Sequence, residues 1–169
     1  MHIYLKENKD EERFLRKKTQ TVDVDSLEKR ELRELIKEMR LMMKKANGIG
    51  LSANQIGLPH KIFVAEVFDS NNQPKFYSIL NPEIIKISKE KVLLEEGCLS
   101  IPGIYGALER AKEITIKGFN KDGKPLKIKA WGLLAHVFQH EIDHLNGILF
   151  TDKTKQTYEQ PQGGRLQKF

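Results

Sequence analysis

The hydrophobic and polar positions of this chain follow two different periods, which divide it into helical and extended segments. After Asp25 the apolar residues recur with the spacing of one helix face, at Leu27, Leu32, Leu35, Ile36, Met39, Met42, Met43 and Ala46. Asp25 with Glu28 three residues later is typical of a helix start, and Asn47-Gly48 is typical of a helix end. The pattern therefore predicts a long amphipathic helix near the N-terminus.

From Lys61 the pattern changes to short runs typical of β-strands. They cover residues 61–68, 76–81, 83–88 and 92–94, with turn signals at Asn71-Asn72 and Asn81-Pro82. Residues 113–119 and 126–130 alternate on either side of a turn at residues 120–123, which predicts a β-hairpin. A last helix is expected over residues 131–145, because Asn146-Gly147 is a good C-terminal stop.

Helix, strands and helix in this order indicate an α+β fold. No internal repeat or change of composition divides the chain before its tail, so residues 1–152 are expected to form a single domain. Residues 153–169 are polar, rich in Gln and Gly, and are expected to form a poorly ordered tail without chemistry.

Length and composition narrow the class of protein. The 169 residues are about one domain, and 39% hydrophobic with 31% charged residues is typical of a soluble globular protein. No stretch approaches the roughly 18 apolar residues of a spanning helix, and the first residues lack the apolar core of a secretion signal. The only cysteine, Cys98, cannot form an intrachain disulfide and favours a reducing compartment, so a cytoplasmic location is expected.

The net charge of +6 and a pI near 9.3 suggest an anionic partner, but the excess is spread thinly along the chain. Many N-terminal charges lie beside opposite ones, as in Glu28-Lys29-Arg30-Glu31, which is typical of a solvated helix face. We therefore expect no specific nucleic-acid site, and at most a weak attraction to a partner such as the ribosome.

The segment His140-Glu141-Ile142-Asp143-His144 is the strongest chemical signal. Two histidines four residues apart stand one above the other on a helix and can bind one metal ion. The carboxylate of Glu141 can then take a proton from a metal-bound water and pass it to a leaving nitrogen. The alternative is a pair of surface histidines on an ordinary amphipathic helix, because so short a motif also occurs by chance.

A catalytic metal needs a third protein ligand and an open position for water. His136 is excluded by geometry, since it lies about 12 Å along the helix from His144, whereas metal–nitrogen bonds are about 2 Å long. Residues 145–150 contain no His, Asp or Glu, and Asp152 lies beyond the expected helix end and is a weak candidate. A lone cysteine is more often a core residue, but beside an incomplete histidine pair Cys98 becomes the preferred third ligand.

The glycines near residue 50 allow two interpretations. Gly48-Ile49-Gly50-Leu51-Ser52-Ala53 fits a dinucleotide fingerprint, but such a fingerprint follows a strand, whereas this segment follows a predicted long helix. Close approach of the backbone to an extended ligand explains the glycines better. Gln55 could offer an amide N–H to such a ligand, with an ordinary surface glutamine as the alternative.

Three segments taken together resemble the three motifs of the peptide deformylases. They are GIGLSANQ at residues 48–55, EGCLS at 96–100 and QHEIDH at 139–144, and the resemblance extends from about residue 14 to residue 152. The chain departs from the family at Ser52, where Ala is usual, and lacks the usual Pro before Leu15-Arg16. The first is a change between small residues, and the second concerns only the N-terminal lead.

The resemblance implies antiparallel β-sheets packed around a central C-terminal helix that carries the HExxH motif. It implies a metallo-amidohydrolase that removes the N-formyl group from the formyl-methionine of nascent polypeptides and releases formate. Cys98, His140 and His144 would hold the metal, and metal-bound hydroxide would attack with Glu141 as general acid/base. The metal would be Fe(II), with Zn, Ni or Co as substitutes, because each accepts a thiolate and two imidazoles.

The resemblance also assigns residues to the substrate. Gln55 and the backbone N–H of Leu99 would stabilise the oxyanion. The residues expected to bind the substrate are, for its backbone, Ile49, Gly50 and Gly97 and, for the methionine pocket, Leu133 and Val137. The expected partners are formyl-methionyl nascent peptides and, weakly, the ribosome, and a monomer in a bacterial-type cytoplasm without membrane contact is expected. His136 lies near the pocket wall and receives no role.

Two rival functions remain open from the residues. A general HExxH metallopeptidase would use a carboxylate or a third histidine as ligand, so it predicts that Cys98→Ser leaves metal content and turnover unchanged. A non-enzymatic relative would bind the ribosome or RNA and leave formyl-Met-Ala intact.

Overall fold

The computed structural model describes residues 1–26 and 28–160. Three α-helices, eight strands and two short 3-10 helices make up this part of the chain. In chain order they are α1 (Lys9–Leu15), α2 (Lys29–Lys45), β1 (Gly50–Ser52), η1 (Ala53–Ile56), β2 (Ile62–Phe68), β3 (Pro74–Ile87), β4 (Lys91–Cys98), β5 (Ile101–Ala111), β6 (Glu113–Phe119), β7 (Pro125–Trp131), α3 (Gly132–Leu145), η2 (Phe150–Asp152) and β8 (Thr157–Glu159). The predicted α+β class is confirmed.

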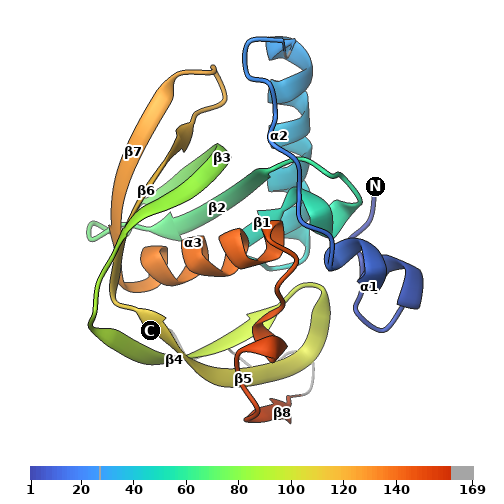
Figure 1. Ribbon diagram of the computed structural model, residues 1–169, viewed down its shortest axis with the longest axis vertical. Helices are drawn as coiled ribbons and strands as arrows, with labels where there is room; N and C mark the ends of the chain where they lie inside the picture. The colour runs from blue at the N-terminus through green and yellow to red at the C-terminus, as the bar shows by residue number, and fades with distance from the viewer. Residues whose placement is uncertain (27, 161–169) are drawn as a thin grey trace.

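Two antiparallel sheets lie on either side of α3. Five strands form one sheet in the order β1-β2-β3-β6-β7, and three strands form the other in the order β4-β5-β8. In Figure 1 the helix α3 runs through the middle of the molecule, between the larger sheet and the strands β4, β5 and β8. This arrangement agrees with the expected sheets around a central C-terminal helix, and α3 contains the residues of the HExxH segment.

Apolar packing fixes α3 against the larger sheet. The ring of Phe138 meets the rings of Phe63 in β2 and Tyr77 in β3 edge to face, each with centroids 5.3 Å apart. Ala135 and Leu145, near the two ends of the helix, are fully buried in the same cluster. Burying a large apolar side chain stabilises a fold by about 1.5–3 kcal/mol, so this helix is a firm support for the polar residues on its other face.

The N-terminal helices differ in part from the sequence pattern. α2 buries the apolar face that the periodicity predicts, but it begins at Lys29, and the prediction that Asp25 caps it was wrong. The backbone N–H of Asp25 instead donates to Oδ1 of Asp23, so this residue belongs to a local turn. α1 was not predicted, although Asn8 followed by three acidic residues is a helix-start signal, and the Asn8 side chain indeed caps it.

The strands differ from the predicted runs in several places, and the short strand β1 and most of β4 were not predicted. The predicted runs 76–81 and 83–88 form one strand, β3, which ends at Ile87. Between them Asn81 adopts a positive φ of 49°, and the pairing register with β6 shifts between Leu80 and Glu83. The turn signal there marks a β-bulge, which bends a strand without ending it. β5 was not predicted, since Pro102 and two glycines interrupt its alternation of apolar and polar residues.

The chain beyond residue 152 is partly described. Residues 153–156 follow η2, and β8 then pairs antiparallel with β5, so the structure shows a short ordered strand where the polar sequence suggested none. All three residues of β8 are exposed, which explains why no hydrophobic pattern marks it. The rest of the expected tail, residues 161–169, lies outside the described residues.

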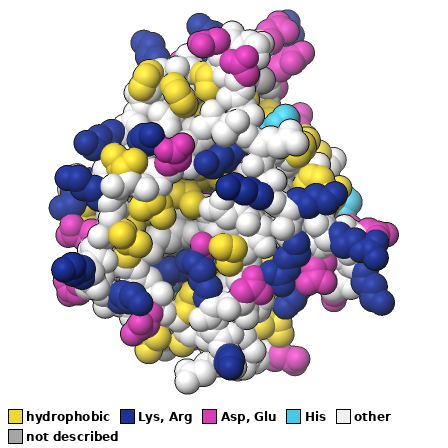
Figure 2. Space-filling view, viewed as in Figure 1, with side chains coloured by type: hydrophobic (Ala, Val, Ile, Leu, Met, Phe, Trp, Pro, Cys, Tyr) yellow, Lys and Arg dark blue, Asp and Glu magenta, His cyan; other side chains and the backbone are white. Residues whose placement is uncertain are grey.

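The surface carries charges of both signs. On the face seen in Figure 2, lysine and arginine side chains are scattered with acidic side chains among them, and they do not gather into one basic patch. No helix in the described part of the chain combines the length and the hydropathy needed to cross a membrane.

Candidate metal centre and active site

The two histidines of the HExxH segment meet across one turn of α3. Nε2 of His140 lies 3.1 Å from Nε2 of His144, and both side chains are almost completely enclosed. The i, i+4 spacing on a helix produces this proximity, as the sequence predicts. The pair therefore presents two nitrogen ligands to one point in space.

Cys98 approaches this histidine pair from the three-stranded sheet. It is the last residue of β4, at a shift in the β4–β5 register where the chain turns toward Ile101. Its Sγ lies 3.1 Å from Nε2 of His144. One ligand atom from each of Cys98, His140 and His144 lies within 4.8 Å of the others, and no other such group of three occurs among the described residues.

The three ligand atoms fit a divalent ion. In a tetrahedral site, bond lengths of about 2.0–2.3 Å place neighbouring nitrogen and sulfur ligands about 3.3–3.6 Å apart. The two 3.1 Å separations at His144 are close to these values. One thiolate and two imidazoles leave a fourth position for water or substrate, which a catalytic ion requires.

The other ligand candidates lie elsewhere. Nε2 of His136 is 2.8 Å from Oε1 of Glu96, so this histidine turns to a carboxylate and not to the cluster. Asp152 pairs with Arg16 and accepts the backbone N–H of Leu149. Neither His136 nor Asp152 belongs to the group of metal-ligating atoms.

The buried carboxylate of Glu96 forms a hydrogen bond with the ring nitrogen of His140 that faces away from His144. Glu96, two residues before Cys98, accepts hydrogen bonds from Nδ1 of His140 and Nε2 of His136, each at 2.8 Å, and from Nε and a terminal nitrogen of Arg110 at 2.6 and 2.9 Å. The bond at Nδ1 fixes the ring of His140 so that Nε2 is the nitrogen turned to the metal position.

The buried charges of Glu96 and Arg110 stabilise each other. Burial opposes the ionised form of Glu96, but the hydrogen bonds from His136, His140 and Arg110 outweigh it and hold its pKa well below the usual range. The guanidinium of Arg110 also pairs with Asp143, and its pKa is raised by these two partners in spite of burial. Sequence reasoning missed Arg110, because it lies on the unpredicted strand β5, and treated Glu96 only as part of a motif.

The two histidines have different electrostatic environments. Burial and the neighbouring charge of His140 hold the pKa of His144 well below its usual value, so its imidazole is neutral. Burial acts in the same direction on His140, but hydrogen bonds to Cys98 and Glu96 outweigh it and raise the pKa of that histidine. A metal ion binds each ring through an unprotonated nitrogen.

Glu141 lies between the two histidines in sequence and is 2% exposed. Its burial raises the pKa of the carboxyl group to about 7, against the opposing effects of the His140 charge and a hydrogen bond from Ser52. The Oγ of Ser52 donates this bond to Oε2 of Glu141 at 2.5 Å. A carboxyl group with such a pKa can both accept and release a proton near neutral pH.

Gln55 reaches the cluster from η1. Its Oε1 accepts the backbone N–H of Ser52 at 2.9 Å, and this bond directs the amide nitrogen to the other side. Nε2 then lies 3.1 Å from Oγ of Ser100 and 3.7 Å from Sγ of Cys98. Gln55 is thus buried at the site, and the alternative of a surface glutamine is excluded by its 1% exposure.

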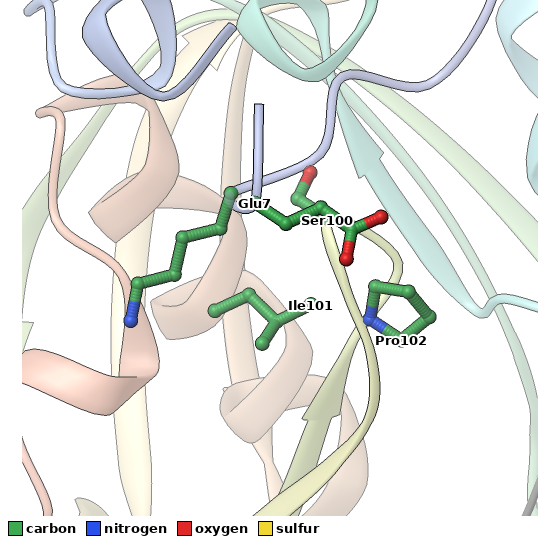
Figure 3. A pocket seen from close by; sticks show the side chains of 5 residues that line it. Glu7, Ser100, Ile101 and Pro102 are labelled. Carbon is green, nitrogen blue, oxygen red and sulfur yellow. The ribbon is translucent and has the colours of Figure 1, made fainter. Parts of the chain in front are cut away.

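The N-terminal arm, residues 1–8, forms backbone hydrogen bonds to the segments that contain Gln55 and Ser100. The backbone N–H of Tyr4 donates to the carbonyl oxygen of Gln55 at 2.7 Å, and that of Lys6 donates to the carbonyl oxygen of Ser100 at 2.9 Å. A surface hollow beside this arm is shown in Figure 3, lined by Lys6, Glu7, Ser100, Ile101 and Pro102. None of the predicted site residues lines this hollow.

The residues expected to bind a substrate backbone lie on two sheet edges. β1 is an edge strand of the larger sheet and β4 an edge strand of the smaller one, so each offers unpaired backbone groups within the described residues. Ile49, just before β1, is 44% exposed. At Gly97 in β4, an added Cβ would come within 2.7 Å of the ring of Tyr105, so only glycine fits there.

The other predicted substrate residues lie just after β4 or on α3. Leu99 follows Cys98 in the turn after β4 and packs against the apolar cluster under β1. Leu133 and Val137 lie one turn apart on α3, the first 43% exposed and the second buried. A partly exposed apolar residue above a buried one is suited to the wall of an apolar pocket.

Comparisons with known proteins agree on one family. The family model described as polypeptide deformylase matches residues 6–160. A peptide deformylase of Halothermothrix orenii is 48% identical over 119 residues, which are 70% of this chain and 75% of the relative. The crystal structure of a probable peptide deformylase from Synechococcus phage S-SSM7 is 40% identical and has a TM-score of 0.82, covering 91% of this chain and 99% of the other.

A second similar structure has a peptide bound. It is a Met-Ala-Ser-bound class I type b peptide deformylase from Acinetobacter baumannii. This chain matches it with a TM-score of 0.82 and 28% identity, over 91% of this chain and 98% of that one.

Proposed function

This chain belongs to the polypeptide deformylase family of hydrolases, and we propose that it removes the formyl group from the N-terminal formyl-methionine of nascent polypeptides. The observation that carries the proposal is the meeting of Cys98, His140 and His144 at one point, with the buried carboxyl group of Glu141 beside them. A thiolate, two imidazoles and an acid/base of suitable pKa are the groups that metal-assisted amide hydrolysis needs.

Cys98, His140 and His144 would hold one divalent ion, which, when bound, lowers the pKa of a water molecule and polarises the formyl carbonyl. Fe(II) is the proposed native ion, with Zn, Ni or Co as substitutes. A ferrous ion beside the Cys98 thiolate would make the enzyme sensitive to oxygen, because either the metal or the sulfur can be oxidised.

Glu141 would act as general base and then as general acid. It takes one proton from the attacking water, whose oxygen forms the new bond to the formyl carbon. When the carbon–nitrogen bond breaks, Glu141 returns that proton to the leaving nitrogen, so the products are a free amine and formic acid, which gives up its remaining acidic proton to solvent and leaves as formate. Its pKa of about 7 matches both steps.

Two donors would stabilise the negative charge that develops on the formyl oxygen. Nε2 of Gln55 already lies on the cluster side of its amide, 3.7 Å from Sγ of Cys98. The backbone N–H of Leu99, next to Cys98 in the chain, is the second proposed donor. Fixed donors of this kind lower the barrier because they need no reorientation during the reaction.

The substrate would bind as an extended strand between the edges of β1 and β4, through Ile49, Gly50 and Gly97. Backbone pairing of this kind is independent of side chains, which suits an enzyme that meets many sequences after the first residue. Leu133 and Val137 would line the methionine pocket. The peptide-bound state of the related Acinetobacter baumannii structure supports binding of such a peptide to this fold.

We also propose an oligomeric state and a location for the enzyme. We propose a monomer that acts in a bacterial-type cytoplasm, with the net charge of +6 as a minor aid in approaching the ribosome. A specific nucleic-acid site is not part of the proposal, because opposite charges are interspersed on the face seen in Figure 2.

The test is formate release from formyl-Met-Ala by metal-loaded protein under anaerobic conditions, with metal analysis of the same sample. Turnover that scales with bound metal supports the proposal. Protein that carries one metal per chain and leaves the formyl group intact refutes it.

A further inference from the structure

Ser52 makes a contact that neither the metal cluster nor the oxyanion donors require. It is the last residue of β1, is fully buried, and its side chain faces α3. Its Oγ lies 2.5 Å from Oε2 of Glu141 and 3.0 Å from the carbonyl oxygen of the same residue. A hydroxyl group that donates to a carboxylate at this distance forms a strong, charge-assisted hydrogen bond.

Gly50, two residues earlier, faces the same side chain. Residues two apart on a strand point to the same side of the sheet, so Gly50 and Ser52 both face Glu141. A Cβ added at Gly50 would overlap Oε1 of Glu141. β1 therefore accommodates Oε1 in the space left by the missing Cβ of Gly50 and offers a hydrogen-bond donor to Oε2.

We propose that Ser52 is a positioning residue for the reaction, holding the Glu141 carboxyl group by Oε2 so that Oε1 is directed to the water and to the leaving nitrogen. The proposal rests on the proposed function, because it assigns Ser52 a role through Glu141 as acid/base. It adds a determinant of turnover that lies on β1 and touches neither the metal nor the substrate.

No other hydrogen bond to the side-chain oxygens of Glu141 occurs among the described residues. Without the hydroxyl, the three side-chain torsions of Glu141 would be restrained by packing alone. A misplacement of about 1 Å in a catalytic group can cost about 100-fold in rate. Loss of one positioning bond is therefore expected to lower kcat about tenfold.

Ser52 is itself well fixed. It pairs with Phe63 of β2, and its backbone N–H donates to Oε1 of Gln55 at 2.9 Å. That second bond comes from the backbone and survives any change of the side chain. Replacing Ser52 by alanine therefore removes the contact with Glu141 and leaves the contact with Gln55, which separates the two effects.

The competing interpretation is a purely structural one, in which the hydroxyl serves the carbonyl oxygen of Glu141 at 3.0 Å. Thr19 supplies a matched control for it. Its buried hydroxyl donates to the carbonyl oxygen of Leu145 at the end of the same helix, at 2.9 Å, and contacts no carboxyl group. Thr19→Val thus removes a buried hydroxyl from a backbone carbonyl of α3 away from the site.

The first experiment measures formate release by metal-loaded wild type, Ser52→Ala, Ser52→Thr and Thr19→Val. We expect Ser52→Ala to lower kcat about tenfold with KM within twofold and metal content unchanged. Ser52→Thr, which keeps a hydroxyl on Cβ, is expected to regain most of kcat, and Thr19→Val to keep wild-type kcat. A Ser52→Ala enzyme with wild-type kcat, or one that loses as little as Thr19→Val, overturns the proposal.

The second experiment reads the contact without turnover. The melting temperatures of wild type, Ser52→Ala, Glu141→Ala and the double variant form a thermodynamic cycle. Ser52→Ala is expected to lower Tm by about 2–4 °C in the wild-type background and by clearly less when Glu141 is alanine. Equal shifts in both backgrounds mean that the hydroxyl serves the backbone, and they overturn the proposal even if Ser52→Thr does not fold.

The two proposals fail in different ways. If wild-type protein with bound metal releases no formate, the proposed function fails and the role of Ser52 fails with it. If the wild type is active and Ser52→Ala is equally active, only the role of Ser52 is lost.

Discussion

Oε2 of Glu96 lies 2.8 Å from Nδ1 of His140, so a carboxylate two residues before one proposed ligand orients another. The same carboxylate neutralises the buried guanidinium of Arg110, and both side chains are at most 3% exposed. β4 and α3 are thus joined at the candidate metal centre by a charged layer beneath the ligands.

Glu96→Gln keeps the volume of this side chain and removes its charge. We expect metal affinity to fall about 10–100-fold, because a histidine ligand loses its orienting partner. The free energy of unfolding should fall by about 3 kcal/mol, since the buried charge of Arg110 loses a partner. Chelator competition and chemical denaturation measure the two effects.

Glu113→Gln is the control for this variant, because Glu113 pairs with Lys129 on the surface and lies in β6. Its metal affinity and stability should equal those of the wild type. A Glu96→Gln protein that also matches the wild type in both would refute the orienting role of Glu96.

Changes of the proposed ligands are expected to remove the metal. His140→Ala and Cys98→Ser should each lower metal content well below one ion per chain, and turnover should fall in parallel. Elemental analysis of the purified variants measures this directly. Full occupancy and unchanged turnover in Cys98→Ser would instead favour a metallopeptidase with a carboxylate or histidine as third ligand.

Stability is expected to depend on pH through Glu66, which joins β2 to α2. Burial opposes its ionisation, but hydrogen bonds from Lys44 and Arg40 outweigh it and lower its pKa below the usual 4.5. A carboxyl group with a lowered pKa in the folded state stabilises the fold above its unfolded pKa and loses that effect as pH falls through the folded value.

The melting temperature of the wild type should therefore fall more steeply below pH 4.5 than that of Glu66→Gln, which has no charge to lose. The two proteins should converge at the lowest pH at which both fold. Parallel curves across this range would show that the ion pairs of Glu66 contribute nothing to stability.

Much of the site could be predicted because its residues follow local rules. The i, i+4 spacing of His140 and His144 is a property of any helix, and the geometric exclusion of His136 needs only the helix rise. The contacts across elements could not be predicted in this way. Arg110 reaches Glu96 only because β5 pairs with β4, and β5 carries no alternating pattern.

In the fold, too, features set by local sequence could be predicted and contacts between elements could not. Long periodic segments such as α2 and α3 were predicted, whereas the start of α2 was misplaced because the Asp23 side chain forms a local turn. Ser52 was read as a small residue in place of another small residue. Its hydrogen bond to Glu141 depends on the packing of β1 against α3, which no local pattern specifies.

The most direct test of the account is the comparison of wild type with Glu141→Ala in one anaerobic assay of formate release from formyl-Met-Ala, with metal analysis of both samples. We expect equal metal content, rapid release by the wild type and a loss of at least about 100-fold in kcat for Glu141→Ala, because the acid/base alone is removed. Comparable turnover by the two metal-loaded proteins would contradict the assignment of Glu141 and with it the proposed mechanism.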